Sequence, residues 1–72
     1  MSEPKISAIS ESRYNGGARI RRMYGSSTVT VFLVGYEGTP FRTWKSIEGF
    51  GPTPGDRKTY AIEKFKRDSV KP

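Results

Sequence analysis

The 72-residue sequence contains no cysteine and no histidine. Without cysteine the chain has no disulfide and no thiolate that could bind zinc or act as a nucleophile. Without histidine it lacks the side chain that most often transfers protons near neutral pH. The seven Asp and Glu residues are scattered along the sequence and form no evident pair. We therefore expect no metal, no cofactor, no small-molecule substrate and no enzymatic activity.

Long apolar runs are also missing. The longest spans Val31 to Val34, whereas about 20 apolar residues are needed to cross a bilayer. The first residues do not show the basic and then apolar pattern of a secretory signal. We therefore expect a cytoplasmic protein without a membrane partner. With a hydrophobic content of only 33%, a chain of this length is expected to form one small domain.

Positive charge is the feature that the chain has in excess. Thirteen Lys and Arg face seven Asp and Glu, which gives a net charge of +6. The excess is confined to two segments, 19–24 and 52–72, each with a net charge of +3, whereas 1–18 and 25–51 are neutral. Concentrated positive charge without catalytic side chains is typical of proteins that bind a polyanion.

The sequence predicts an α+β fold with a three-stranded antiparallel sheet packed against one C-terminal helix. Residues 1–18 are rich in Ser and Gly and are predicted to form a flexible N-terminal arm, so that the single domain spans 19–70. Alternating or β-branched residues predict strands at 19–24, 28–36 and 41–47. Thr53 and Pro54 provide a helix N-cap and first residue, so a helix is expected from there to Asp68 or Ser69.

The large apolar side chains near these elements are expected to form the core. The predicted core residues are Phe32, Phe41, Trp44, Ile47 and Phe65. Ala61, Ile62 and Phe65 form the apolar stripe of the predicted helix, and Arg57 is expected to face water. Tyr36, beside the turn at Glu37 and Gly38, is the aromatic residue expected to be most exposed.

Cations of the first predicted strand and of the helix are candidates for phosphate contacts. Three arginines in one strand without a nearby acid repel each other unless a partner neutralises them. Exposed lysines on a helix are also explained by solvation alone. The candidate nucleic-acid-binding residues are Arg19, Arg21, Arg22, Tyr36, Arg42, Lys45, Lys64, Lys66 and Arg67.

One segment order resembles a known family. Three predicted strands followed by a helix, with Phe41, Trp44 and the helix entry at 54–58, resemble the arm-type DNA-binding domain at the N-terminus of some tyrosine recombinases. The resemblance implies that a sheet face bearing Arg19, Arg21 and Arg42 meets the DNA major groove, and that the end of the helix touches phosphates.

The sequence thus favours a small, non-catalytic nucleic-acid-binding protein, with duplex DNA as the first choice of partner. The alternative is a small protein-interaction module or inhibitor, of the kind encoded by viruses and mobile elements, which docks on an acidic partner protein. A third possibility is an accessory protein whose basic segments fill gaps in a larger nucleoprotein assembly.

Overall fold

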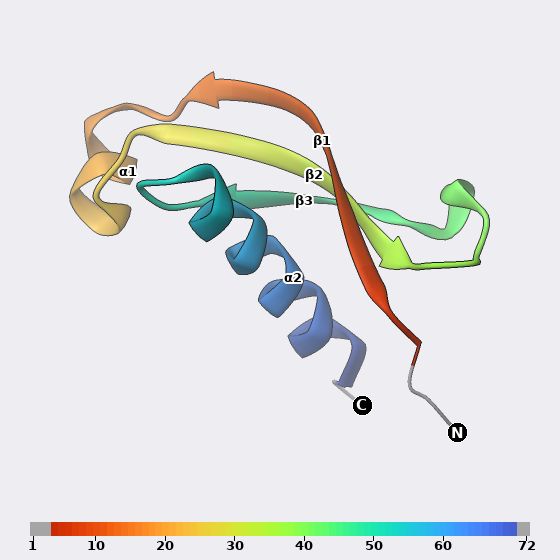
Figure 1. The fold of residues 1–72 in the computed structure, drawn as a ribbon. Coiled ribbons are helices and arrows are strands. Elements are labelled where there is room, and N and C mark those ends of the chain that lie inside the picture. Colours follow the sequence, from red (N-terminus) through yellow and green to blue (C-terminus); the bar gives the residue numbers. More distant parts are fainter. Residues whose placement is uncertain (1–3, 71–72) are drawn as a thin grey trace.

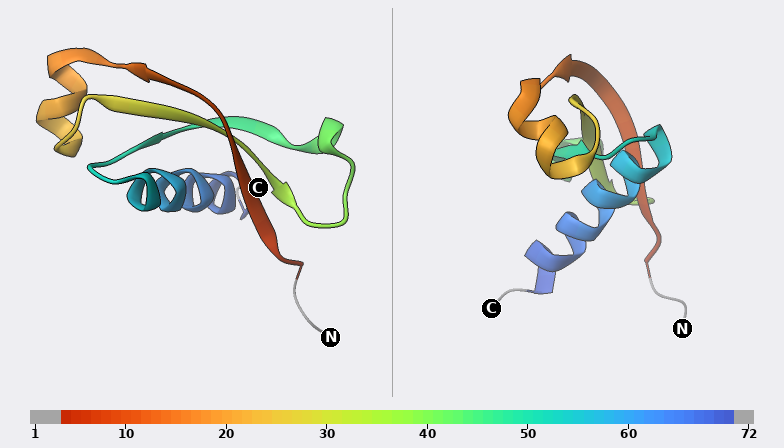
Figure 2. Two further views of the ribbon diagram at one scale, coloured as in Figure 1. Left: turned by 45° about the horizontal axis from the view of Figure 1, so that its top comes forward. Right: turned by 90° about the vertical axis from the view of Figure 1, so that its left-hand side faces the viewer.

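The computed structural model describes residues 4–70, which form a three-stranded antiparallel sheet with one long helix across one face (Figure 1). The elements are β1 (Ile6–Asn15), α1 (Gly17–Tyr24), β2 (Thr28–Tyr36), a 3₁₀ turn η1 (Phe41–Thr43), β3 (Lys45–Phe50) and α2 (Pro54–Val70). The short helix α1 lies at one end of the sheet, and the turn between β2 and β3 lies at the other (Figure 2). The predicted fold class is confirmed: the sheet packs against a C-terminal helix.

The central strand β2 has the bounds that its sequence predicts. Its β-branched and aromatic residues suit a strand paired on both sides, and it pairs with β1 and β3 in antiparallel register. Phe32 and Val34 are buried on the face covered by α2. Val29 lies on the opposite face and is also fully buried, because the residues that begin α1 cover that end of the strand.

The hydrophobic core lies between the sheet and α2. It comprises Phe32, Val34, Ile47, Ala61 and Phe65, with Ile62 partly buried beside it. Three of the five predicted core residues are therefore confirmed.

The other two predicted core residues lie outside this layer. Phe41 is 61% exposed, because the segment Phe41–Thr43 forms the turn η1 and not the start of a strand. Trp44 is half-buried, and its indole covers Gly35 on the sheet face away from α2. The third strand accordingly begins four residues later than predicted and ends at Phe50.

The assignment of the first strand was wrong. Residues 19–24, predicted to be a strand, form α1, and β1 lies within residues 1–18, the segment predicted to be an arm. Ile20 and Tyr24 are four residues apart, so a helix turns both toward the sheet while the arginines between them stay exposed. Gly25 then ends the helix in the left-handed conformation, and its N–H donates to the carbonyl of Arg21. Residues 1–3 of the predicted arm lie outside the described residues.

The helix α2 begins as the sequence predicts. The Thr53 hydroxyl accepts a hydrogen bond from the N–H of Asp56 at 3.1 Å, and its carbonyl accepts one from Arg57 at 3.0 Å. Pro54 is the first helical residue, where its missing N–H has no consequence. The helix extends to Val70, one residue beyond the predicted end. Within residues 4–70, no helix has the length and apolar character needed to span a membrane.

Candidate nucleic-acid interface

The arginines predicted to bind nucleic acid in the first strand are carried by α1 instead. Arg19, Arg21 and Arg22 are all exposed on this eight-residue helix. They therefore project from one end of the sheet and do not lie on a sheet face. The recombinase resemblance implied that Arg19 and Arg21 lie on a sheet face, and this expectation was wrong.

Three aromatic rings join α1 to the rest of the fold. The ring of Tyr24 stacks on Phe50 with a centroid distance of 4.6 Å and an angle of 14°. Tyr60 of α2 meets both rings edge-on, at centroid distances of 5.6 Å and 5.2 Å. The two tyrosine hydroxyls lie 3.4 Å apart. This cluster, which we call the aromatic junction, holds α1 and α2 beside each other at the end of β3.

Cations from both helices lie near the aromatic junction. The hydrogen bond to Tyr60 raises the pKa of Tyr24 above its usual value of 10.0, as do partial burial and the charge of Tyr60 on ionisation. The positive charges of Lys64 and Arg19 act on the same hydroxyl in the opposite direction. Lys64 follows Tyr60 by one helical turn, so it lies on the side of α2 that contacts Tyr24 of α1.

The flank of α2 that carries Tyr60 continues this positive surface. Lys64 lies four residues after Tyr60, and Arg67 lies three residues after Lys64. These spacings place all three side chains on one side of the helix. Both cations are exposed. We call the following five residues the α1–α2 basic surface: Arg19, Arg21, Arg22, Lys64 and Arg67. Lys66 is exposed but lies two residues from Lys64 and points to another side of α2.

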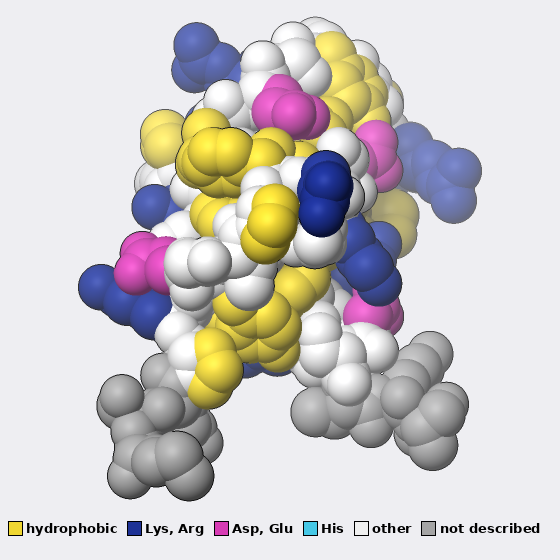
Figure 3. All heavy atoms as spheres, turned by 90° about the vertical axis from the view of Figure 1, so that its right-hand side faces the viewer, with side chains coloured by type: hydrophobic (Ala, Val, Ile, Leu, Met, Phe, Trp, Pro, Cys, Tyr) yellow, Lys and Arg dark blue, Asp and Glu magenta, His cyan; other side chains and the backbone are white. Residues whose placement is uncertain are grey.

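Three predicted site residues lie at the opposite end of the sheet. Arg42 is in η1 and Lys45 begins β3, where it pairs with Val34 of β2. Tyr36 is half-buried and packs edge-on against Phe65 at 5.4 Å, so the expectation that it is the most exposed aromatic was wrong. Seen from this end, hydrophobic side chains fill much of the view, and Lys, Arg, Asp and Glu side chains are spread among and around them (Figure 3).

The sheet face away from α2 carries carboxylates. Glu48 lies opposite Val31 on this face and accepts a hydrogen bond from Tyr14, which raises the pKa of that phenol. Glu11 accepts a weaker hydrogen bond, 3.4 Å long, from Ser46. This face of the sheet therefore carries the negative charges of Glu11 and Glu48.

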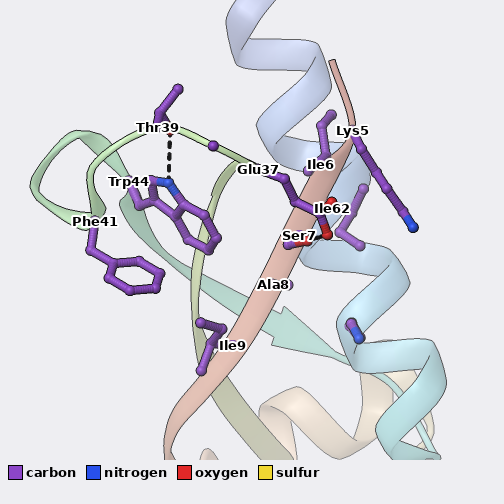
Figure 4. Close-up of a pocket in the computed structure, with 12 residues that line it drawn as sticks. Lys5, Ile6, Ser7, Ala8, Ile9, Glu37, Thr39, Phe41, Trp44 and Ile62 are labelled. Carbon is purple, nitrogen blue, oxygen red and sulfur yellow. Dashed lines mark hydrogen bonds between the residues drawn. The ribbon is translucent and has the colours of Figure 1, made fainter. Parts of the chain in front are cut away.

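A cavity of about 660 Å³ lies between the start of β1 and the turn that joins β2 to β3 (Figure 4). Trp44 donates its indole N–H to the Thr39 hydroxyl at 2.9 Å, and Ser7 donates to the Glu37 carboxylate. These polar groups therefore have partners within the fold. Nor do residues 4–70 contain three or more acidic side chains placed to bind a metal ion together.

Comparison of the chain with protein-family models, curated proteins and solved structures finds no match to any of them.

Proposed function

We propose that this protein is a non-catalytic, cytoplasmic nucleic-acid-binding protein that contacts the phosphate backbone of duplex DNA through the α1–α2 basic surface. The observation that carries the proposal is the contact between Tyr24 of α1 and Tyr60 of α2, because each of these two helices bears exposed cations. Two segments that are distant in sequence, each with a positive excess, thereby contribute to one surface. Each cation that neutralises a phosphate releases bound counterions, which is the main source of non-specific affinity for DNA.

The packing of the aromatic rings favours duplex over single-stranded nucleic acid. Proteins that bind single strands stack bases on open aromatic faces. In the aromatic junction, the rings of Tyr24, Phe50 and Tyr60 are in contact with one another. The surface therefore offers cations for phosphates more readily than platforms for bases.

Matched double variants test where DNA binds. The variant Arg19→Gln/Lys64→Gln removes two charges at the aromatic junction, and Arg42→Gln/Lys45→Gln removes two charges at the other end of the sheet. All four side chains are exposed, so both variants are expected to fold. At low salt we expect the first to bind a random duplex about tenfold more weakly, and the second to change affinity less than about threefold. Equal losses of DNA affinity in the two variants would show that binding depends on the net charge of the protein and not on the α1–α2 basic surface.

A protein-interaction module remains the second candidate because of two exposed apolar side chains on β1 and η1. Ile9 is 47% exposed and Phe41 is 61% exposed, so both side chains offer apolar surface to a partner. Competition with polyglutamate separates the two functions. A nucleic-acid-binding protein is expected to retain DNA in the presence of polyglutamate at equal charge concentration, whereas a module for acidic proteins would release it.

A further inference from the structure

A second cavity lies between β1 and the first turn of α2, and it adjoins the first cavity because Ala8 and Lys58 line both. Its volume is about 440 Å³, which is within the range of small-ligand sites. The residues that matter for its chemistry are Arg13, Thr30, Pro54, Gly55, Arg57 and Lys58. Among the described residues that line it, three carry a positive charge and none is acidic. We call this space the β1–α2 cavity.

An irregularity in β1 brings Arg13 to this cavity. The register between β1 and β2 shifts between Ser10 and Ser12, so one extra residue is accommodated there. A one-residue shift reverses which side chains face each side of a sheet. After the shift, Arg13 pairs with Thr30 and shares its face, which is the face covered by α2. Without the extra residue, Arg13 would point to the open face of the sheet.

Arg57 places a buried positive charge at the floor of the same cavity. Only 6% of this side chain is exposed, although the sequence predicted that it would face water. Its Nε–H donates to the Thr30 hydroxyl at 3.0 Å, and its Nη1 donates to the Gly51 carbonyl at 3.1 Å. Both acceptors are neutral. A guanidinium stays protonated in proteins and is stabilised when an anion approaches it.

The start of α2 leaves room for such an anion. Gly55 is in the first turn, and a Cβ built on it would have Thr53 Oγ1 at 4.0 Å as its nearest neighbour. A ligand can therefore approach the backbone at the positive end of the helix dipole. Asp56, which lies between Gly55 and Arg57 in the sequence, does not line the cavity, and its Cβ lies beside Gly51.

We propose that the β1–α2 cavity binds a phosphate group, held by Arg13 and Lys58 over the buried charge of Arg57. The site is separate from the α1–α2 basic surface, because Lys58 and Tyr60 lie on opposite flanks of α2. The inference therefore stands whether or not the protein binds duplex DNA. The phosphate group belongs either to a free nucleotide or to the terminal phosphate of a nucleic-acid strand.

Amide NMR shifts of the full chain during titration with inorganic phosphate test the site. The titration is made at constant ionic strength and at pH about 7.5, where phosphate carries nearly two negative charges. We expect saturable shifts at residues 13, 55, 57 and 58 with a dissociation constant of about 1 mM. Arg13→Gln and Lys58→Gln each remove a charged hydrogen bond and should weaken binding about tenfold. The control Lys45→Gln removes an exposed charge elsewhere and should leave binding within about twofold.

Two further ligands identify the source of the phosphate group. Adenosine monophosphate represents a free nucleotide, and trinucleotides with a 5′-phosphate or a 5′-hydroxyl represent a strand end. Tighter binding of the phosphorylated trinucleotide than of the monophosphate assigns the site to strand ends, and the reverse order assigns it to nucleotides. The proposal is overturned if none of the phosphate-bearing ligands gives saturable shifts at the cavity up to about 20 mM, or if Lys45→Gln weakens binding as much as Arg13→Gln.

The same titration on Arg19→Gln/Lys64→Gln separates this inference from the proposed function. Phosphate binding is expected to persist in that variant while duplex binding falls. Loss of both together would mean that the two surfaces are one site, which contradicts the proposal.

Discussion

Replacing Gly49 with alanine is expected to destabilise the contact between β3 and α2. Gly49 is buried, and a Cβ at this position would overlap the carbonyl oxygen of Arg57 and lie 2.9 Å from Cε2 of Phe32. The closest atom is the backbone carbonyl oxygen of Arg57, so a change of side-chain rotamer cannot relieve the overlap, and α2 has to move away from the sheet. Overpacking a core costs about 1–3 kcal/mol.

The displaced helix would also strain the two hydrogen bonds of Arg57, to Thr30 and Gly51, each of which contributes about 1 kcal/mol. We therefore expect Gly49→Ala to lower the free energy of unfolding by about 3 kcal/mol. A 72-residue domain has a total stability of about 4–11 kcal/mol, so this loss is a large part of it. The melting temperature should fall by about 12–24 °C.

Urea denaturation followed by far-UV circular dichroism measures the effect. The matched control is Gly55→Ala, which adds the same methyl group in the first turn of α2, where the space is open. Alanine is favoured over glycine in helices by up to about 1 kcal/mol, so the control is expected to be neutral or slightly stabilising. A loss below about 0.5 kcal/mol for Gly49→Ala would refute the close approach of α2 to β3.

Three further changes test other parts of the fold. Thr53→Ala removes the N-cap hydrogen bond to Asp56 and should cost about 1 kcal/mol in urea denaturation; no loss would exclude Thr53 as the cap. Phe65→Ala empties the core beside Val34 and should cost about 3–5 kcal/mol, which lowers the melting temperature measured by circular dichroism by about 12–40 °C; an unchanged melting curve would place the core elsewhere. The raised pKa of Tyr24 means that the folded state holds this proton more tightly than the unfolded chain does. Its contribution to stability is full below pH about 10 and is lost as the pH rises through the raised pKa. Wild type should therefore lose more stability than Tyr24→Phe between pH about 9 and 11, and parallel losses would exclude the Tyr24–Tyr60 contact.

The central strand and the C-terminal helix were predictable because their local signals agree with their tertiary environment. Residues 28–36 combine β-branched and aromatic side chains in a run too short for a typical helix, and β2 has those bounds. Thr53 and Pro54 mark the start of α2 through hydrogen bonds made within one turn. Neither element depends on a residue distant in sequence to define its type.

The segment 19–24 was assigned wrongly because its pattern fits two structures. Six residues with Ile20 and Tyr24 as the inward-facing pair satisfy helical spacing as well as strand alternation. Gly25, in the left-handed conformation, is the C-terminal helix signal that distinguishes them. The strand β1 was not recognised since it is an edge strand with a register shift, and most of its side chains are exposed.

The sequence named the five residues of the α1–α2 basic surface as candidates, but it did not predict how α1 and α2 are arranged. Charge segregation identified Arg19 and Lys64 as candidates, and both are exposed. The two helices that carry them meet through Tyr24 and Tyr60, which are 36 residues apart. Arg57 was predicted to face water but is buried. A charged residue in the first turn of a helix is usually exposed, and only the fold brings Thr30 close enough to be its hydrogen-bond partner.

The salt dependence of duplex binding tests the central proposal most directly. Fluorescence anisotropy of a labelled random duplex at about 50 and 200 mM salt gives the log–log slope of affinity against salt, about −0.9 for each phosphate contacted. Contacts by three to five residues of the α1–α2 basic surface predict a slope of about −2.7 to −4.5, which is a loss of affinity of about 40- to 500-fold over this range. Absence of binding at the lower salt concentration, or an affinity that does not change with salt, would contradict the account.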